Sequence, residues 1–357
     1  MRIVITGGAG FVGSSLALAF RAKHPKAEIF AFDNLKRRGS ELNLERFRKH
    51  DITFAHGDVR QPEDLAALPG NFDLVIDASA EPSVLAGLDG SPAYLIGTNL
   101  TGTINCLELA RSRAKSFVFL SSSRVYSISP LRELALEEGP TRLTLSSKQA
   151  SAGVGPAGIA EDFPVHLPRS LYGATKLASE LLVQEYASAF GLRAVINRCG
   201  VIAGPGQFGK VDQGVFTLWV ANHAFGKPLK YTGFGGTGKQ VRDLLHPDDL
   251  FRAIELQLAD IDRLAGETFN LGGGQDCSTS LAELTALCQR VTGRSVPIAN
   301  ETESAKVDIP FFVSNSAKAG AAFGWRPQKN VANIVSDIFA WLEKERERLA
   351  PLFGASP

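Results

Sequence analysis

The stretch Thr6-Gly7-Gly8-Ala9-Gly10-Phe11-Val12-Gly13 decides the fold of this chain. An apolar run typical of a strand precedes it, and residues 14–23, a run typical of a helix, follow it. Its glycines let the backbone turn tightly and approach an anion, while the helix N-terminus offers free N–H groups and partial positive charge. The stretch therefore predicts a loop that binds the pyrophosphate of a dinucleotide. The expected contacts in it are Gly7, Gly10, Phe11 and Val12.

An acidic residue beyond the loop indicates which dinucleotide is bound. Asp33 ends the next predicted strand, 20 residues past Gly13. This is near the spacing of the carboxylate that accepts a hydrogen bond from a ribose 2′-hydroxyl in NAD sites. The basic cluster Lys36-Arg37-Arg38 leaves an alternative open, because it could hold the 2′-phosphate of NADP or simply form a solvated loop. A carboxylate would repel that phosphate, so we expect NAD.

Short apolar runs alternate with longer helical patterns through the first half of the chain. This rhythm predicts an α/β fold with a Rossmann-type, doubly wound parallel sheet. We expect an NAD-binding domain at residues 1–200 with a returning segment at about 238–262, and a smaller C-terminal substrate-binding lobe in the remainder of 201–357. Residues 127–168 predict a long irregular loop that is functional or mobile. The expected strands are residues 3–6, 28–32, 52–55, 74–76, 116–120 and 193–198, and the clearest expected helices are 14–23, 99–112 and 172–190.

Composition excludes several classes of protein. The 38 Lys and Arg residues against 37 Asp and Glu residues give a net charge of +1, so no overall field attracts nucleic acid or an anionic membrane. The four cysteines have neither metal-ligand spacing nor the density of a disulfide scaffold, and no metal site is expected. The N-terminus lacks the pattern of a signal peptide, and no apolar run reaches the roughly 20 residues that span a bilayer. We therefore expect a cytoplasmic protein that binds neither nucleic acid nor membrane.

The segment Tyr172-Gly173-Ala174-Thr175-Lys176 predicts a catalytic pair. Four-residue spacing places Tyr172 and Lys176 on one face of a helix. A tyrosine with a pKa near 10 needs about 4 kcal/mol of phenolate stabilisation to act as a base near pH 7, and Lys176 and a cationic nicotinamide ring are the expected sources. Alone, the pair is also compatible with a core aromatic and an exposed amine. It gains weight from Ser121-Ser122-Ser123 at a predicted strand end, where a serine can hydrogen-bond a reacting hydroxyl.

Together, the glycine loop, the strand-end serines and the Tyr-x-x-x-Lys pair resemble the extended short-chain dehydrogenase/reductase family of nucleotide-sugar epimerases and dehydratases. The resemblance covers nearly the whole chain and implies Ser122, four residues before Tyr126, as the catalytic serine beside Tyr172 and Lys176. Family dehydratases carry Asp-Glu directly after this serine, whereas this chain has Ser123-Arg124, so the resemblance implies an epimerase. It also implies cofactor contacts from Asp33, Asn34, Asp58, Val59, Ala78, Ser79, Ala80, Asn99, Tyr172 and Lys176, although residues 78–80 could form a plain turn.

The C-terminal half contains the expected substrate contacts. Arg242 matches the family arginine that meets a nucleotide diphosphate, a role that suits its planar fork. A salt bridge to Asp243 or Asp248 is the alternative for this arginine. The resemblance of the chain to the family implies substrate contacts from five residues, Ser83, Ser122, Gln207, Gln213 and Arg242.

Within the family, the chain is most similar to the CDP-paratose 2-epimerases, through residues 32–39, 206–214 and 238–243. It has Ala305 where that subgroup has an arginine, and Lys306 keeps a charge nearby. The leading hypothesis is an NAD-dependent epimerase of a nucleotide-diphosphate sugar, which oxidises a ring hydroxyl to a ketone and returns the hydride to the other face.

Other functions and the assembly state stay open. A nucleotide-sugar 4-epimerase or oxidoreductase with the same catalytic residues is the alternative, and a non-catalytic NAD sensor is a remote one. Residues 99–112 and 172–190 resemble the helices that pair across the family's dimer interface, so we expect a homodimer, although either helix could simply cover its own sheet.

Overall fold

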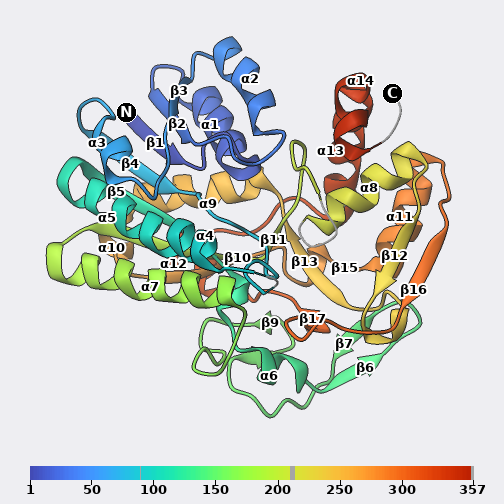
Figure 1. Ribbon diagram of the computed structural model, residues 1–357. Coiled ribbons are helices and arrows are strands. Elements are labelled where there is room, and N and C mark those ends of the chain that lie inside the picture. Colours follow the sequence, from blue (N-terminus) through green and yellow to red (C-terminus); the bar gives the residue numbers. More distant parts are fainter. Residues whose placement is uncertain (89, 210–213, 355–357) are drawn as a thin grey trace.

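The computed structural model describes residues 1–88, 90–209 and 214–354, and its centre is a seven-stranded parallel sheet. The strand order is β14-β10-β5-β4-β1-β2-β3, with β1 between β2 and β4, and helices cover both faces (Figure 1). This confirms the predicted α/β fold with a doubly wound sheet. The strands of the sheet are β1 (Arg2–Thr6), β2 (Glu28–Asp33), β3 (Thr53–His56), β4 (Phe72–Asp77), β5 (Ala114–Ser122), β10 (Arg193–Cys199) and β14 (Thr268–Leu271).

Side chains alternate between the two faces of this sheet, as the period of two in a strand requires. In β1, Ile3 and Ile5 join the buried cluster on one face, and Val4 joins the cluster on the other. The first face is covered by α1 (Phe11–Lys23), α2 (Asn43–Lys49), α9 (Pro247–Ala259), α10 (Ile261–Leu264) and α12 (Ala317–Phe323). The second face is covered by α3 (Pro62–Ala66), α4 (Ala93–Ile96), α5 (Gly102–Arg113) and α7 (Leu171–Phe190).

The two helices nearest the site begin in different ways. Helix α7 starts after Ser170, whose Oγ accepts a hydrogen bond from Gly173 N (3.1 Å), and it ends at Gly191 in the left-handed conformation. The helix expected at 99–112 is divided, because a short π-helix, η2 (Gly97–Thr101), precedes α5. Such wide turns occur often at functional sites.

A second lobe packs against the carboxyl ends of the large sheet (Figure 1). Its sheet contains β11 (Val201–Ile202), β13 (Val241–Leu245), β15 (Ser278–Ser280) and β17 (Phe311–Phe312), and β12 (Leu229–Thr232) pairs separately with β16 (Ile298–Glu301). Its helices are α8 (Val215–Phe225), α11 (Leu281–Thr292), α13 (Val331–Lys344) and α14 (Arg346–Leu349). Short 3-10 turns are η1 (Ser40–Leu42), η3 (Ser123–Val125), η4 (Phe234–Gly236), η5 (Gln275–Cys277) and η6 (Ala350–Phe353).

The returning segment of the chain is divided between the two lobes. Strand β13 belongs to the second sheet, whereas α9, which follows it, packs against α1 on the large sheet. The large sheet also takes its last strand, β14, from beyond the expected segment 238–262. The boundaries drawn from the sequence stay a prediction.

Residues 127–168 are not the structureless loop that their composition predicts. They form a helix and two small hairpins, α6 (Ile128–Arg132), β6 (Leu136–Glu138) with β7 (Leu143–Leu145), and β8 (Val154–Gly155) with β9 (Gly158–Ile159). Ile159 N donates to Val313 O (2.8 Å), and Ile159 and Phe163 are buried in an apolar cluster with residues 309–313. These elements are too short to show a hydrophobic periodicity in the sequence, so they become visible only in the folded structure.

Within the described residues, none of the helices has the length and apolar character needed to cross a membrane.

Candidate active site

A cleft of about 1090 Å³ separates the carboxyl ends of the large sheet from the second lobe. Ser122, Tyr172 and Lys176 line it on the sheet side, and Gln207 and Arg242 line it from the second lobe. Residues that are far apart in the sequence therefore face one ligand-sized space, in the crevice where α/β sheets bind ligands.

The glycine loop fits a close approach to a pyrophosphate. Gly7 has a φ of +61°, and a Cβ added there would lie 2.7 Å from the Ala78 carbonyl oxygen. A Cβ on Gly13 would lie 2.2 Å from the Gly7 carbonyl oxygen, so the helix can pack on the loop only without a side chain. Helix α1 begins after Gly10 with no side-chain cap and no acidic residue in its first turn. Its first N–H groups are therefore oriented to receive an anion, and Phe11 and Val12 line the cleft.

Asp33 lies at the end of β2, beside this loop. Its Oδ2 accepts a hydrogen bond from Ala9 N (3.1 Å) and its Oδ1 accepts one from Leu35 N (2.7 Å). Burial raises the pKa of the Asp33 carboxyl, and these backbone hydrogen bonds oppose that rise. Lys36, part of the basic cluster, lies with Nζ 4.0 Å from the centre of the Tyr94 ring. The carboxylate, rather than this cation, adjoins the glycine loop, as expected for an NAD site.

The next expected cofactor contacts form a small polar cluster. Asn34 Nδ2 donates to Asp58 Oδ2 (2.9 Å), and Arg60 forms an ion pair with the same carboxylate (2.6 Å). Arg60 is the main cause that lowers the pKa of Asp58 to about 2. The carbonyl of Val59 accepts a hydrogen bond from Asn105 Nδ2 (2.8 Å). These residues lie at the ends of neighbouring strands but outside the lining of the main cleft.

Hydrogen bonds to buried side chains hold the segment from Ala78 to Ser83 in place. Ala78 and Ala80 line the cleft, and the Ser79 hydroxyl donates to Asp77 (2.6 Å). Asn99 is fully buried: its Oδ1 accepts from Glu81 N (2.7 Å) and its Nδ2 donates to Glu81 O (3.1 Å). Asn99 therefore supports this segment from the π-helix. Ser83 accepts a hydrogen bond from Leu85 N (3.2 Å) and is not among the lining residues.

Tyr172, Lys176 and Ser122 come together as the sequence predicts. Helix α7 places Tyr172 and Lys176 on the face that packs against β5, where Ser122 ends the strand. Ser122 hydrogen-bonds the Tyr172 phenol, and its Oγ accepts from Arg124 N (3.1 Å). Lys176 Nζ donates to Leu120 O (3.0 Å). The three side chains therefore converge on the cleft with fixed backbone support.

The electrostatics of Tyr172 differ from the expectation. Burial raises the pKa of the Tyr172 phenol, while the hydrogen bond from Ser122 and the charge of Arg124 oppose that rise. Lys176 was expected to lower this pKa, but its ammonium hydrogen-bonds a carbonyl and its own pKa is lowered by burial. In the chain by itself, the cation that most offsets the burial of Tyr172 is therefore Arg124.

Arg242 forms neither of the salt bridges considered from the sequence. Its Nη2 donates to Asp308 Oδ1 (3.0 Å) and to Ile309 O (2.6 Å), because β13 runs beside β17 and the residues that precede it. Burial lowers the pKa of the Arg242 guanidinium, and the charge of Asp308 only partly opposes this. Arg242 and Asp308 both line the cleft.

Of the two glutamines expected to contact substrate, Gln207 is among the described residues. Gln207 lines the cleft, but its amide is used inside the chain: Nε2 donates to Ile202 O (3.0 Å) and Oε1 accepts from Thr217 Oγ1 (2.6 Å). Gln213 lies outside the described residues.

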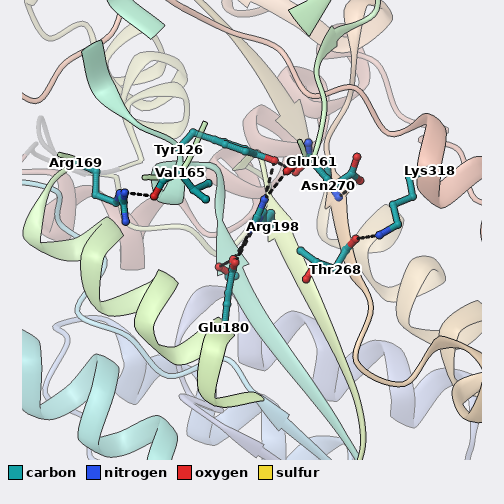
Figure 2. Close-up of polar contacts among 10 residues, drawn as sticks. Tyr126, Glu161, Val165, Arg169, Glu180, Arg198, Thr268, Asn270 and Lys318 are labelled. Carbon is teal, nitrogen blue, oxygen red and sulfur yellow. Dashed lines mark hydrogen bonds and ion pairs between the residues drawn. The ribbon is translucent and has the colours of Figure 1, made fainter. Parts of the chain in front are cut away.

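Other residues at the site carry no local motif. Cys199, opposite Ser122 in the strand register, and Asp308 and Glu301 all line the cleft. Behind it, Arg198 of β10 is surrounded by Glu180, Tyr126 and the Glu161 carbonyl (Figure 2). Glu180 follows Lys176 by four residues, so helical spacing could have placed it on the same face. For the others, only the fold brings the residues together.

The comparisons with known proteins agree with this geometry. The family model described as the NAD dependent epimerase/dehydratase family matches residues 3–272. CDP-paratose 2-epimerase from Salmonella typhi is 30% identical over 352 residues, with 96% of this chain and 99% of the relative covered. UDP-glucuronate 4-epimerase from Thermodesulfobacterium geofontis is 26% identical over 355 residues, with 96% of this chain and 97% of the relative covered. A dTDP-glucose 4,6-dehydratase from Streptomyces venezuelae, solved with NAD bound, is 27% identical with a TM-score of 0.75, covering 99% of this chain and 100% of that chain.

Proposed function

Because this chain belongs to the NAD dependent epimerase/dehydratase family, we propose that it is an NAD-dependent epimerase of a nucleotide-diphosphate sugar, most like a CDP-paratose 2-epimerase. One observation carries the choice of reaction. At the two positions where the family's dehydratases place an acid pair, this chain has Ser123 and Arg124, and Arg124 lines the cleft beside Tyr172. A guanidinium keeps its proton and cannot serve as the acid or base for removing water.

The residues of the chain support the redox step. In its phenolate form, Tyr172 accepts the proton of a ring hydroxyl, while Ser122 donates a hydrogen bond to the same oxygen as negative charge grows on it. A bound NAD supplies the acceptor for the hydride of that carbon and gives it back. The sugar becomes a ketone, turns over in the cleft and receives the hydride on its opposite face, and Tyr172 returns the proton. No net oxidation occurs.

The same residues divide the work of holding the two ligands. The first turn of α1 and Asp33 would hold the cofactor. Among the described residues, Lys176 donates one side-chain hydrogen bond, to Leu120 O, which leaves two donors of its ammonium for a ligand. Arg242, on the opposite wall, would hold the nucleotide diphosphate while the sugar rotates. The cleft volume of about 1090 Å³ leaves room for a sugar between these two anchors.

The experiment that tests this function is product analysis. The purified protein is incubated with NAD and with CDP-, UDP- and dTDP-hexoses that carry deuterium at the candidate carbon, and products are identified by NMR. We expect an epimer that keeps its deuterium. Absence of any epimer, with deuterium released to free cofactor, would contradict the proposal. Tyr172→Phe should bind NAD normally but lose about 100- to 10,000-fold in turnover, whereas unchanged biological activity in that variant would favour an NAD sensor.

A 4-epimerase is the second candidate, because a UDP-glucuronate 4-epimerase aligns with nearly the whole chain. It uses the same first step and differs in which hydroxyl faces Tyr172. Ring coupling constants in the NMR spectrum of the product distinguish a 2-epimer from a 4-epimer. Mass spectrometry of any nucleotide sugar that co-purifies would name the base.

The proposal includes a homodimer formed through α5 and α7. Leu181 on α7 is 57% exposed, which is unusual for a leucine in the middle of a long helix that packs on a sheet. Light scattering should give twice the mass of the chain, and Leu181→Glu should shift the protein to a monomer. A wild-type monomer would contradict this assembly.

A further inference from the structure

Arg124 is held rigidly beside the catalytic tyrosine. It lies in η3, directly after Ser122, and its N–H donates to the Ser122 hydroxyl (3.1 Å). Its carbonyl packs against the first turn of α7, where a Cβ added to Gly173 would lie 2.0 Å from the Arg124 oxygen. The backbone that carries this arginine is therefore fixed relative to Tyr172, and its side chain extends along the cleft wall.

The guanidinium of Arg124 has donors to spare. It offers five N–H groups, yet its one hydrogen bond to the described residues is a long contact from Nη1 to Val307 O (3.4 Å). No carboxylate of the described residues forms an ion pair with the Arg124 guanidinium. Arg242, in contrast, forms an ion pair with Asp308, with 3.0 Å between Nη2 and Oδ1. A largely buried guanidinium with so few partners is costly unless a ligand completes them.

Charge at this wall is also unbalanced. Arg124 and Arg242 both contact the segment 307–309, and Asp308 is the carboxylate that both of them feel. Asp243 also acts on Arg242, whereas Asp308 is the one carboxylate of the described residues whose charge clearly acts on Arg124, and Asp308 already forms an ion pair with Arg242. The positive charge of Arg124 is therefore only partly balanced. Of the two arginines, Arg124 is the one whose charge acts on the Tyr172 phenol. The cleft therefore presents a cation between its redox end and its diphosphate end.

We propose that Arg124 is a specificity-determining residue that binds the sugar itself, with its free N–H groups donating to oxygen substituents of the ring. This inference rests on the proposed function, in which Arg242 holds the diphosphate and Tyr172 acts on a ring hydroxyl. The group between those two anchors is the sugar. The planar fork of an arginine suits two neighbouring acceptors, which a lysine cannot reproduce.

The experiment measures how much the sugar adds to binding. Dissociation constants are determined by calorimetry on the NAD-loaded protein for CDP and CDP-glucose, and in parallel for UDP and UDP-glucose. Four proteins are compared: the wild type, Arg124→Met, Arg242→Met and Arg113→Met. Arg113 is the matched control, because it also donates to carbonyl groups, those of Ala66 and Gly70, but lies at the opposite end of β5.

In the wild type we expect each nucleotide sugar to bind more tightly than its diphosphate. Arg124→Met should weaken the nucleotide sugars by about 10- to 100-fold and change the diphosphates by less than about 2-fold, since hydrogen bonds to a charged group are lost only with the sugar. Arg242→Met should weaken both kinds of ligand, and Arg113→Met neither. Arg124→Lys should recover only part of the loss, because it keeps the charge without the fork.

Three results would overturn the inference. The first is an Arg124→Met protein that loses CDP as strongly as CDP-glucose, which would assign Arg124 to the diphosphate. The second is unchanged binding of both ligands with a lower melting temperature, which would make Arg124 structural. The third is a wild type that gains nothing from the sugar. Failure of the proposed function gives a different pattern, in which the wild type binds none of the four ligands and Arg242→Met changes nothing.

Discussion

Two buried arginine–carboxylate pairs of this molecule have the same chemistry and opposite surroundings. Arg198 and Glu180 lie behind the cleft, with side chains 9% and 2% exposed, and Arg242 and Asp308 lie in its wall, with side chains 12% and 32% exposed. Arg198 donates to both Glu180 oxygens, to the Tyr126 hydroxyl and to the Glu161 carbonyl (Figure 2). The first pair is saturated by the protein, and the second is left with cleft on one side.

The pKa shifts of the two arginines run in opposite directions. Burial by itself would lower the pKa of the Arg198 guanidinium, but the charge and hydrogen bonds of Glu180 outweigh it and raise this pKa. Burial lowers the pKa of Arg242, and Asp308 does not restore it. The difference teaches that a complete set of partners marks a structural pair, whereas an incomplete set marks a place where a ligand supplies the rest.

The structural pair also explains how the proposed catalytic residues are held. Tyr172, Lys176 and Glu180 follow one another at four-residue spacing on α7, and each hydrogen-bonds a residue of β5. Glu180 accepts a hydrogen bond from Ser121 Oγ (2.5 Å), next to Ser122, the proposed catalytic serine. The pair therefore fixes the helix against the strand that carries the serine.

The largest expected effect comes from breaking the saturated pair. Glu180→Gln keeps the shape of the side chain but leaves the Arg198 charge buried without a partner, so the free energy of unfolding should fall by about 3–5 kcal/mol. Denaturant unfolding followed by circular dichroism measures the change. The matched variant Asp308→Asn should lose far less, and equal losses in the two variants would contradict the distinction between the pairs.

Arg242→Met should produce the next largest effect, and on binding rather than stability. Loss of charge-assisted hydrogen bonds should weaken CDP binding by about 1.5–3 kcal/mol, which is roughly 10- to 100-fold. The free energy of unfolding should change by less than about 1 kcal/mol, because the Asp308 carboxylate that remains can reach water. A large loss of stability with unchanged affinity for CDP would place Arg242 with the structural pair.

Asp243 is a buried carboxylate that forms no ion pair with an arginine of the described residues, and the pH dependence of stability tests how it differs from the two pairs. Burial raises the pKa of Asp243 from 3.8 to about 6. The folded protein then binds this proton more tightly than the unfolded chain, so the contribution to stability is lost as pH rises from about 4 to 6 and regained as pH falls. The wild type should gain on the order of 1–2 kcal/mol relative to Asp243→Asn between pH 7 and pH 5. Parallel stability curves for the two proteins across this range would contradict the expectation.

The smallest effect is expected from Asp308→Asn. This carboxylate is about one-third exposed and forms a single ion pair with Arg242, so its loss should cost less than about 1 kcal/mol of stability. Freed from its counter-charge, Arg242 should bind CDP several-fold more tightly at low salt, and 0.5 M NaCl should remove most of that gain. Weaker binding of CDP in the variant would show that Asp308 orients Arg242 instead of competing for it.

Much of the fold was predictable because its signals are local. The glycine loop, the strand at Ile3 and the helix at Tyr172 each depend on residues within one or two turns of chain, and the structure has all three elements in place. Residues 127–168 were not predictable in the same way. Their short hairpins gain stability only from the apolar cluster that they form with residues 309–313.

The sequence by itself predicted the dinucleotide loop and the parallel sheet, and it placed Tyr172 and Lys176 on one helix face, because fixed spacings on a strand or helix decide which side chains share a face. The choice of Ser122 as their partner came from the family resemblance. It also identified the family. Only the tertiary structure decided that Arg242 pairs with Asp308, that Arg198 is enclosed by Glu180, and that Arg124 has donors to spare. The physical reason is that the partners of a buried charge come from distant segments, and burial, which sets the energy of that charge, exists only after those segments pack.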